Sequence, residues 1–139
     1  NGTVDIFKDD ERVLVVSSFQ EDFYPMRYMD YHNPHVVPCP LAANTGSRDF
    51  RRAVEASWLP AIPRHNPDLI LVSAGFDGHA QDPLGGLSLS TDDYRWITAL
   101  IAGLADEHCE GRLLSTLEGG YDLASLADSV EMHVSELLK

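Results

Sequence analysis

Basic residues are scarce in this sequence. Ten lysines and arginines stand against 22 aspartates and glutamates among 139 residues, which gives a formal net charge of −12 at pH 7. A protein that binds nucleic acid through bulk charge needs the opposite balance, so the composition excludes that class of partner. We interpret the excess acidity as a solvated surface. Because 44% of the residues are hydrophobic, the chain is too apolar for a disordered acidic tail, and we expect one globular domain over residues 1–139.

Cysteines and long apolar runs are scarce too. Cys39 and Cys109 are too few and too widely separated for a disulfide framework or a cysteine-based zinc site, which favours a reducing, cytoplasmic location. No apolar run approaches the roughly 20 residues that span a bilayer, and the N-terminus does not have the basic-then-apolar order of a signal peptide. We therefore expect no membrane association.

The first third of the sequence predicts few regular elements. Residues 13–17 form a short β-branched run that predicts a buried strand. Residues 20–34 predict a long aromatic loop, and loops of this length are often functional. Residues 36–39 are a weaker strand candidate, because Pro38 cannot donate a ladder hydrogen bond and belongs at a sheet edge or a bulge.

A helix and a strand follow with clearer patterns. From Ser47 the hydrophobic residues recur at helical spacing, with Ser47 as the expected N-cap and with Pro60 and Pro63 as the expected end. Residues 67–73 then predict the clearest strand of the chain. This strand is apolar on both faces, as expected in a parallel sheet that is covered by helices.

The last third alternates helix and strand. Ser90 and Asp93 form a capping-box pattern ahead of a helix that continues to His108. Residues 113–117 predict a buried strand, and Asp122 is the expected N-cap of a final helix. This order of elements predicts an α/β fold, with a parallel sheet, right-handed crossovers and helices on both faces.

Two loops are the candidate functional segments. In open α/β sheets, ligands bind at the carboxyl ends of the strands, so the residues directly after each predicted strand matter most. The first loop holds two carboxylates and a histidine among glycines, and the second holds a carboxylate and a phenol around a glycine pair. The residues concerned are Asp77, His79 and Asp82 in the first loop and Glu118, Gly119, Gly120 and Tyr121 in the second.

Metal binding is one interpretation of the first loop. A carboxylate with a histidine two residues away, as in Asp77 and His79, suits zinc, because zinc takes oxygen and nitrogen ligands. Catalytic zinc needs three protein ligands, however, and one such loop does not evidently supply them. Acidic residues in glycine turns are more often caps or turn formers. The residues alone leave both interpretations open.

Two longer motifs resemble a known family. Residues 67–85, PDLILVSAGFDGHAQDPLG, and residues 117–121, LEGGY, closely resemble the histone deacetylase family. The match is closest to the branch of class II deacetylases, bacterial acetoin-utilisation proteins and acetylpolyamine amidohydrolases. Asn1-Gly2-Thr3 shortly before Phe7 also matches. The resemblance covers essentially the whole chain and implies a zinc-dependent hydrolase of N-acetyl amides on an arginase-like α/β fold.

The resemblance assigns roles to individual residues. Asp77 corresponds to the last metal ligand of the family, which holds Zn²⁺ in the complete enzyme. Tyr121 corresponds to the tyrosine that polarises the acetyl carbonyl and stabilises the oxyanion. Gly119 and Gly120 allow the backbone to place that tyrosine, and Gly75 and Asp82 complete the supporting loop. These six residues form the expected catalytic end of the sheet.

The resemblance also implies a substrate and a tunnel that binds it. Phe23 and Tyr24 lie where the family lines its substrate tunnel with aromatic side chains. The implied substrate is an acetylated small molecule or an acetyl-lysine side chain. Other prominent residues have plainer interpretations, namely His79 as a loop histidine, His133 as a surface residue, and Trp58 and Trp96 as packing residues.

Several expected residues have no counterpart in the sequence. In the family, an Asp-x-His pair that supplies the other two metal ligands lies a few residues before Asn-Gly-Thr, and a tandem His pair that acts as general base lies further upstream. Neither is present, and Phe19 and Met26-Arg27 replace the usual His and Gly-Thr. The chain, which opens on Asn1 without an initiator methionine, is therefore expected to be the C-terminal part of a deacetylase.

Two functions from different classes remain open at this point. The first is a metal-dependent deacetylase to which this chain contributes the C-terminal part, without activity or tightly bound zinc of its own. The second is a non-catalytic module of the same fold that self-associates or binds a partner. A homo-oligomer is expected, because uncovered sheet edges and apolar helix faces promote pairing with another chain.

Overall fold

The computed structural model describes residues 2–27 and 33–139. Within these ranges the strands β1 and β2 pair in parallel, and so do β3 and β4, which confirms the α/β class with parallel strands. The elements are α1 (Gly2–Phe7), β1 (Val15–Gln20), β2 (Val36–Leu41), α2 (Ser47–His65), β3 (Ile70–Ala74), α3 (Thr91–Cys109), β4 (Leu113–Leu117) and α4 (Leu123–Leu137).

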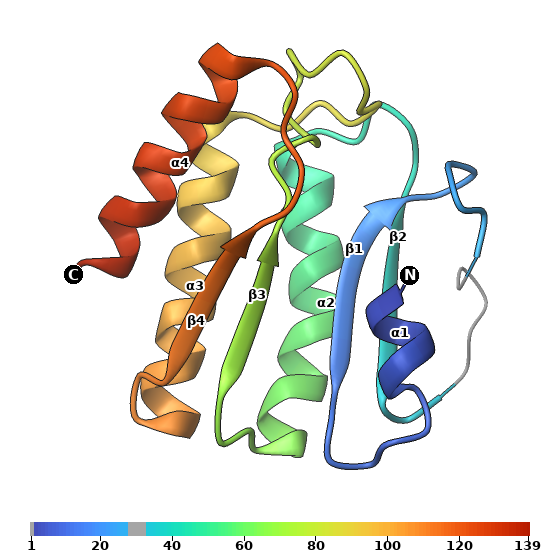
Figure 1. Ribbon diagram of the computed structural model, residues 1–139, viewed down its shortest axis with the longest axis vertical. Helices are drawn as coiled ribbons and strands as arrows, with labels where there is room; N and C mark the ends of the chain where they lie inside the picture. Colours follow the sequence, from blue (N-terminus) through green and yellow to red (C-terminus); the bar gives the residue numbers. More distant parts are fainter. Residues whose placement is uncertain (1, 28–32) are drawn as a thin grey trace.

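The helices form a layer over the strands. Helices α2, α3 and α4 lie on one side of the strands, and the short helix α1 lies on the other side beside β1 and β2 (Figure 1). At β3 and β4 the described residues place helices on one face only. On the other face the side chains of Leu71 and Leu114, which are partners in the β3–β4 register, are 69% and 58% exposed. The described residues thus place helices on both faces of the strands beside β1 and β2, and on one face beside β3 and β4.

The hydrophobic core lies between the strands and the helical layer. Phe50 on α2 contacts the ring of Trp96 on α3 edge to face, with ring centroids 5.9 Å apart. Trp58 and Trp96 both pack against the core, which confirms their interpretation as packing residues. The buried residues of this core cluster are Cys39, Leu41, Phe50, Val54, Phe76, Leu89 and Tyr94.

Helix α2 differs from the prediction at both ends. It continues through Pro60 and Pro63 to His65, where Asn66 in the left-handed conformation ends it. Each proline removes one backbone hydrogen bond. Ala61 and Ile62, which lie between the two prolines, are buried, and this burial keeps the last turns helical. The prediction that the prolines end the helix is therefore wrong.

The predicted N-cap of α2 is also wrong. Gly46 occupies the N-cap position and Ser47 is the first helical residue. The Ser47 hydroxyl donates a 2.7 Å hydrogen bond to Oδ2 of Asp93 on α3 instead of capping its own helix. The Ser47 side chain, which the local pattern predicted as a cap, therefore binds an acceptor that is distant in the sequence.

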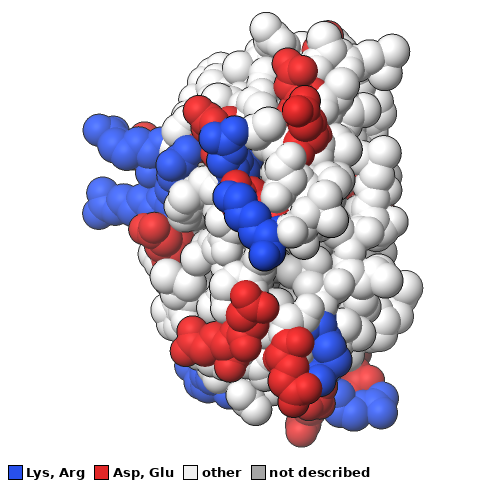
Figure 2. All heavy atoms as spheres, turned by 90° about the vertical axis from the view of Figure 1, so that its left-hand side faces the viewer, with Lys and Arg blue, Asp and Glu red and all other residues white. Residues whose placement is uncertain are grey.

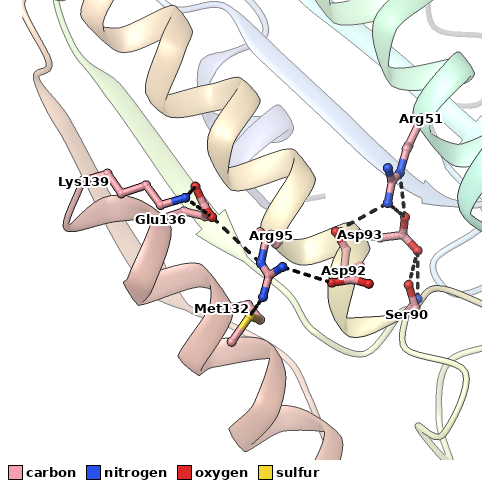
Figure 3. Close-up of polar contacts among 8 residues, drawn as sticks. All are labelled: Arg51, Ser90, Asp92, Asp93, Arg95, Met132, Glu136 and Lys139. Carbon is pink, nitrogen blue, oxygen red and sulfur yellow. Dashed lines mark hydrogen bonds and ion pairs between the residues drawn. The ribbon is translucent and has the colours of Figure 1, made fainter.

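The caps of the other two long helices are confirmed. Ser90 and Asp93 form a reciprocal capping box at the start of α3. Asp122 caps α4 by accepting a 2.9 Å hydrogen bond from the backbone N–H of Ser125. Between these helices, Arg95 on α3 contacts Met132 and Glu136 on α4 (Figure 3).

His133 is not the surface residue that we expected. Its Nδ1 lies 2.7 Å from the hydroxyl of Thr98 on α3, and its Nε2 lies 2.8 Å from the hydroxyl of Ser115 on β4. The imidazole therefore joins three elements, and its partial burial lowers its pKa. Two small hydroxyl residues on neighbouring elements leave the space that the ring fills, which the periodicity of α4 alone could not show.

The N-terminal third has more structure than we predicted. Helix α1 had no sequence signal, whereas β1 and β2 extend the two predicted strands to Gln20 and Leu41. The predicted loop 20–34 includes residues 28–32, which lie outside the described residues.

Among the residues that are described, no helix is long and apolar enough to cross a membrane. Over the side of the molecule that carries α4, acidic and basic side chains are interspersed with wide uncharged areas (Figure 2).

Candidate functional site

The two predicted functional loops lie side by side at the carboxyl ends of β3 and β4 (Figure 1). The strand ladder continues into these loops, because the N–H of Glu118 donates to the carbonyl of Ala74 at 2.9 Å and the N–H of Phe76 donates to the carbonyl of Gly119 at 2.7 Å. These bonds bring Asp77 and the Gly119–Tyr121 segment to the same edge of the sheet.

Glycine backbone lies close to the half-buried Asp77 residue. A Cβ atom on Gly75 or on Gly119 would lie 2.9 Å from the nearest Asp77 side-chain oxygen. A Cβ atom on Gly85 would lie 1.7 Å from the Asp77 carbonyl oxygen, so no residue with a side chain fits at position 85. Glycine at positions 75, 85 and 119 therefore lets the backbone approach Asp77 closely.

Tyr94 supports Asp77 from within the core. Its hydroxyl donates a 2.9 Å hydrogen bond to the carbonyl oxygen of Phe76, and the two rings pack with centroids 5.0 Å apart. Burial, followed by the negative charges of Asp77 and Asp82, raises the pKa of this phenol. Tyr94 therefore stays protonated as a donor. Sequence reasoning did not identify this contact.

His79 is a buried loop residue. Its Nδ1 accepts a 3.2 Å hydrogen bond from the N–H of Gln81, its Nε2 lies 3.4 Å from the Thr91 hydroxyl, and its ring stacks on Tyr94. Both ring nitrogens thus face groups of the same loop or of α3. This geometry supports the interpretation of His79 as a loop histidine.

Asp82 joins the two functional loops. Its Oδ1 accepts from the N–H groups of Leu84 and Gly85 at 2.9 and 3.1 Å, and its Oδ2 accepts from those of Tyr121 and Asp122 at 2.7 and 3.4 Å. Burial acts to raise the pKa of this carboxyl, but the four backbone hydrogen bonds outweigh it and lower the pKa. Asp82 is therefore a carboxylate at neutral pH.

Tyr121 projects from the end of the second loop, and its residue is 54% exposed. Gly120 before it has φ of +141°, and a Cβ atom there would lie 2.7 Å from Leu126 Cδ1. The positive φ favours glycine at position 120, because other residues rarely adopt this backbone conformation. More than half of the Tyr121 residue is therefore exposed to solvent at the end of the second loop.

Phe23 and Tyr24 line a separate hollow. It has a volume of about 300 Å³ and lies beside β1 and α1. The Gln20 side chain at the rim of this hollow accepts a 2.9 Å hydrogen bond from the N–H of Gly86, which ties it to the Asp77 loop. Sequence reasoning missed Gln20. The lining residues are Val4, Ser17, Phe19, Gln20, Asp22, Phe23, Tyr24, Pro25, Met26, Arg27, Val36 and Pro38.

The described residues do not form a complete metal centre. Among residues 2–27 and 33–139 there is no group of three histidine, cysteine, aspartate or glutamate side chains that could hold a metal ion. Catalytic zinc is held by three protein ligands. Asp77 is the single metal ligand that the sequence predicts at this edge of the sheet.

Comparisons with known proteins agree with this fold. A sequence profile of the family described as Histone deacetylase domain matches residues 1–137. Histone deacetylase 10, chloroplastic, of Oryza sativa subsp. japonica is 39% identical over 94% of this chain and 31% of its own length. The histone deacetylase-like amidohydrolase of Pseudomonas aeruginosa is 34% identical over 89% of this chain and 34% of its own length. The chain thus spans about a third of these two relatives.

Solved structures give the same result. The crystal structure of the HDA15 HD domain superposes with a TM-score of 0.90 at 31% identity, covering 99% of this chain and 41% of that chain. The acetylpolyamine aminohydrolase from Burkholderia pseudomallei superposes with a TM-score of 0.87 at 25% identity, covering 98% of this chain and 41% of that chain.

Proposed function

Because the chain belongs to the histone deacetylase family, we propose that it supplies the oxyanion-stabilising tyrosine and one metal ligand of an N-acetyl amide hydrolase. The observation that carries this proposal is the placement of Tyr121. Its exposed phenol follows β4 on a backbone that is hydrogen-bonded to the Asp77 loop. Because the Tyr121 residue is more than half exposed, burial in the core does not account for a tyrosine at this position.

The chemistry of the reaction defines what Tyr121 would do. Hydrolysis of an amide needs an activated water, a base that takes its proton, and a donor for the oxyanion that develops on the carbonyl oxygen. The Tyr121 O–H is the donor. One such donor, aimed at the developing charge, typically lowers the barrier by about 2.7 to 4 kcal/mol.

Asp77 is the proposed zinc ligand. A bound zinc ion would polarise the substrate carbonyl and lower the pKa of a water molecule. Its remaining ligands, and the general base, would have to come from outside the described residues. The chain is therefore proposed to be inactive by itself.

The proposed substrates are acetylated lysines, acetylated polyamines or related small amides. Their acetyl group would reach the Asp77 and Tyr121 edge past aromatic side chains, for which Phe23 and Tyr24 are the candidates. These two residues line the 300 Å³ hollow, which Gln20 ties to the Asp77 loop.

A non-catalytic module is the alternative function. It is favoured by the lack of a three-ligand group among the described residues and by the exposed leucines of β3 and β4. In this case the fold would serve self-association or the binding of a partner protein, and neither Asp77 nor Tyr121 would have a chemical role.

Substitution of Tyr121 in the complete protein that contains these residues separates the two functions. Tyr121→Phe removes one exposed hydroxyl, so we expect unchanged folding and a kcat lower by roughly a hundredfold or more on an acetyl-lysine peptide or acetylpolyamine. Asp77→Asn should lose bound metal and activity together. Unchanged kcat in Tyr121→Phe would refute the proposed role of the phenol.

A further inference from the structure

The Asp82 carboxylate divides its four hydrogen bonds between two loops. Oδ1 accepts from Leu84 and Gly85 in its own loop, and Oδ2 accepts from Tyr121 and Asp122 in the loop after β4. The bond to the Tyr121 N–H is the shortest of the four at 2.7 Å. One oxygen thus shapes the Asp77 loop and the other holds the backbone from which the Tyr121 phenol projects.

We propose that Asp82 is a positioning residue, whose Oδ2 fixes the backbone of Tyr121 so that the phenol is aimed at the substrate carbonyl. This inference rests on the proposed role of Tyr121. It assigns to Asp82 an effect on the chemical step, beyond the turn that Oδ1 forms with Leu84 and Gly85.

The local backbone shows why such a restraint is needed. Gly119 and Gly120 precede Tyr121, and glycine has the widest range of backbone angles. The Tyr121 residue is itself more than half exposed, so packing restrains it weakly. On the other side, Asp122 is held at the start of α4 by its cap to Ser125. Asp82 supplies the restraint at Tyr121 itself, in a reaction where a displacement of about 1 Å can cost about a hundredfold in rate.

The surroundings of Asp82 explain why a carboxylate serves here. Two pairs of N–H donors approach from two loops, and a carboxylate has an acceptor oxygen for each pair. An asparagine has a single acceptor oxygen, and its NH₂ group would face one pair of donors. Asp82→Asn therefore breaks the contact with one loop while almost preserving the side-chain volume.

A double-mutant cycle in the complete protein that contains these residues tests the proposal. We expect Asp82→Asn to lower kcat by about tenfold to a hundredfold, with KM changed by less than about twofold. In a Tyr121→Phe background the same substitution should lower kcat no further, because there is no hydroxyl left to position. If the role of Asp82 were purely structural, Asp82→Asn would lower kcat both in the unmodified protein and in the Tyr121→Phe variant.

Asp122→Asn is the matched control. It removes a neighbouring carboxylate, but asparagine also caps helices well, and the Asp122 side chain makes no hydrogen bond to Tyr121. Its kcat should stay within about twofold of the unmodified protein. An equal loss of kcat in Asp122→Asn and Asp82→Asn would overturn the proposal, because the loss would then follow from removal of negative charge near the sheet edge.

The outcomes separate this inference from the proposed function. If Tyr121→Phe lowers kcat and the losses of the two variants multiply in the double mutant, Asp82 is not a positioning residue while the role of Tyr121 stands. If Tyr121→Phe leaves kcat unchanged, the proposed function fails and this inference fails with it.

Amide hydrogen exchange of the unmodified protein gives a test that does not depend on a variant that folds. The Tyr121 N–H should exchange at least about a hundredfold more slowly than in an unstructured peptide, although its side chain is exposed. Exchange of this N–H at the peptide rate would overturn the proposal, because Oδ2 would then not hold the Tyr121 backbone.

Discussion

Arg51 on α2 and Asp93 on α3 form an ion pair at 2.8 Å in which the Asp93 side chain is completely buried (Figure 3). The same carboxylate accepts hydrogen bonds from the Ser47 hydroxyl and from both the N–H and the hydroxyl of Ser90. Burial acts to raise the pKa of Asp93, but these bonds outweigh it and lower the pKa. Asp93 therefore fastens the N-terminal ends of two helices to each other as a charged group.

Removal of this carboxylate should destabilise the fold strongly. Asp93→Ala leaves the Arg51 charge and two hydroxyl groups without their acceptor, and we expect a loss of about 3 kcal/mol in the free energy of unfolding. The adjacent Asp92 is a matched control, because its side chain is 73% exposed and pairs with Arg95 at 3.5 Å. Asp92→Ala should cost less than about 1 kcal/mol. Urea unfolding of both variants checks this, and equal losses would contradict it.

The sequence predicted the elements whose signals are local. The capping box at Ser90 and Asp93 and the cap at Asp122 involve residues three apart in the chain, and both are present. Ser47 failed as a cap because Asp93, 46 residues later in the chain, takes its hydroxyl. The proline prediction for α2 failed for a related reason, because burial of Ala61 and Ile62 outweighs the lost hydrogen bonds.

The same distinction between local signals and long-range contacts applies to the candidate site. Asp77 and Tyr121 follow strands directly, so their position at one edge of the sheet could be predicted from the order of elements. Gln20 and Tyr94 could not be identified, because they act on the backbone of Gly86 and Phe76 across 66 and 18 residues. No sequence spacing records such side-chain-to-backbone contacts, which depend on how the loops pack.

His133 predicts a dependence of stability on pH. Its pKa in the folded protein lies below the ordinary value of 6.5, so the unfolded chain binds the proton more readily. The contribution of the neutral imidazole is complete above pH 6.5 and declines as the pH falls from there towards the lowered pKa. We expect His133→Gln to flatten this part of the stability profile, measured by urea unfolding between pH 7.5 and 5.5. A slope that is retained in His133→Gln would show that another group titrates there.

The uncovered face of β3 and β4 predicts self-association of the 139-residue chain. Leu71 and Leu114 are cross-strand partners on this face, and exposed apolar patches promote pairing with another surface. We expect a dimer or larger species by light scattering, and Leu71→Glu should shift it towards monomer. Leu138→Glu is the control, because Leu138 is even more exposed than Leu71 but lies beyond α4, away from this face. A monomer at high concentration would contradict this prediction.

The last prediction concerns zinc in the 139-residue chain. Tight zinc binding needs several ligands that are fixed together, and Asp77 is the single expected ligand at the edge of the sheet. A lone carboxylate competes poorly with water, so we expect no stoichiometric zinc after dialysis, measured by elemental analysis. Asp77→Asn should have the same residual zinc content as the unmodified chain. One zinc ion per chain that disappears in Asp77→Asn would contradict the prediction, because further ligands would then have to come from this chain itself.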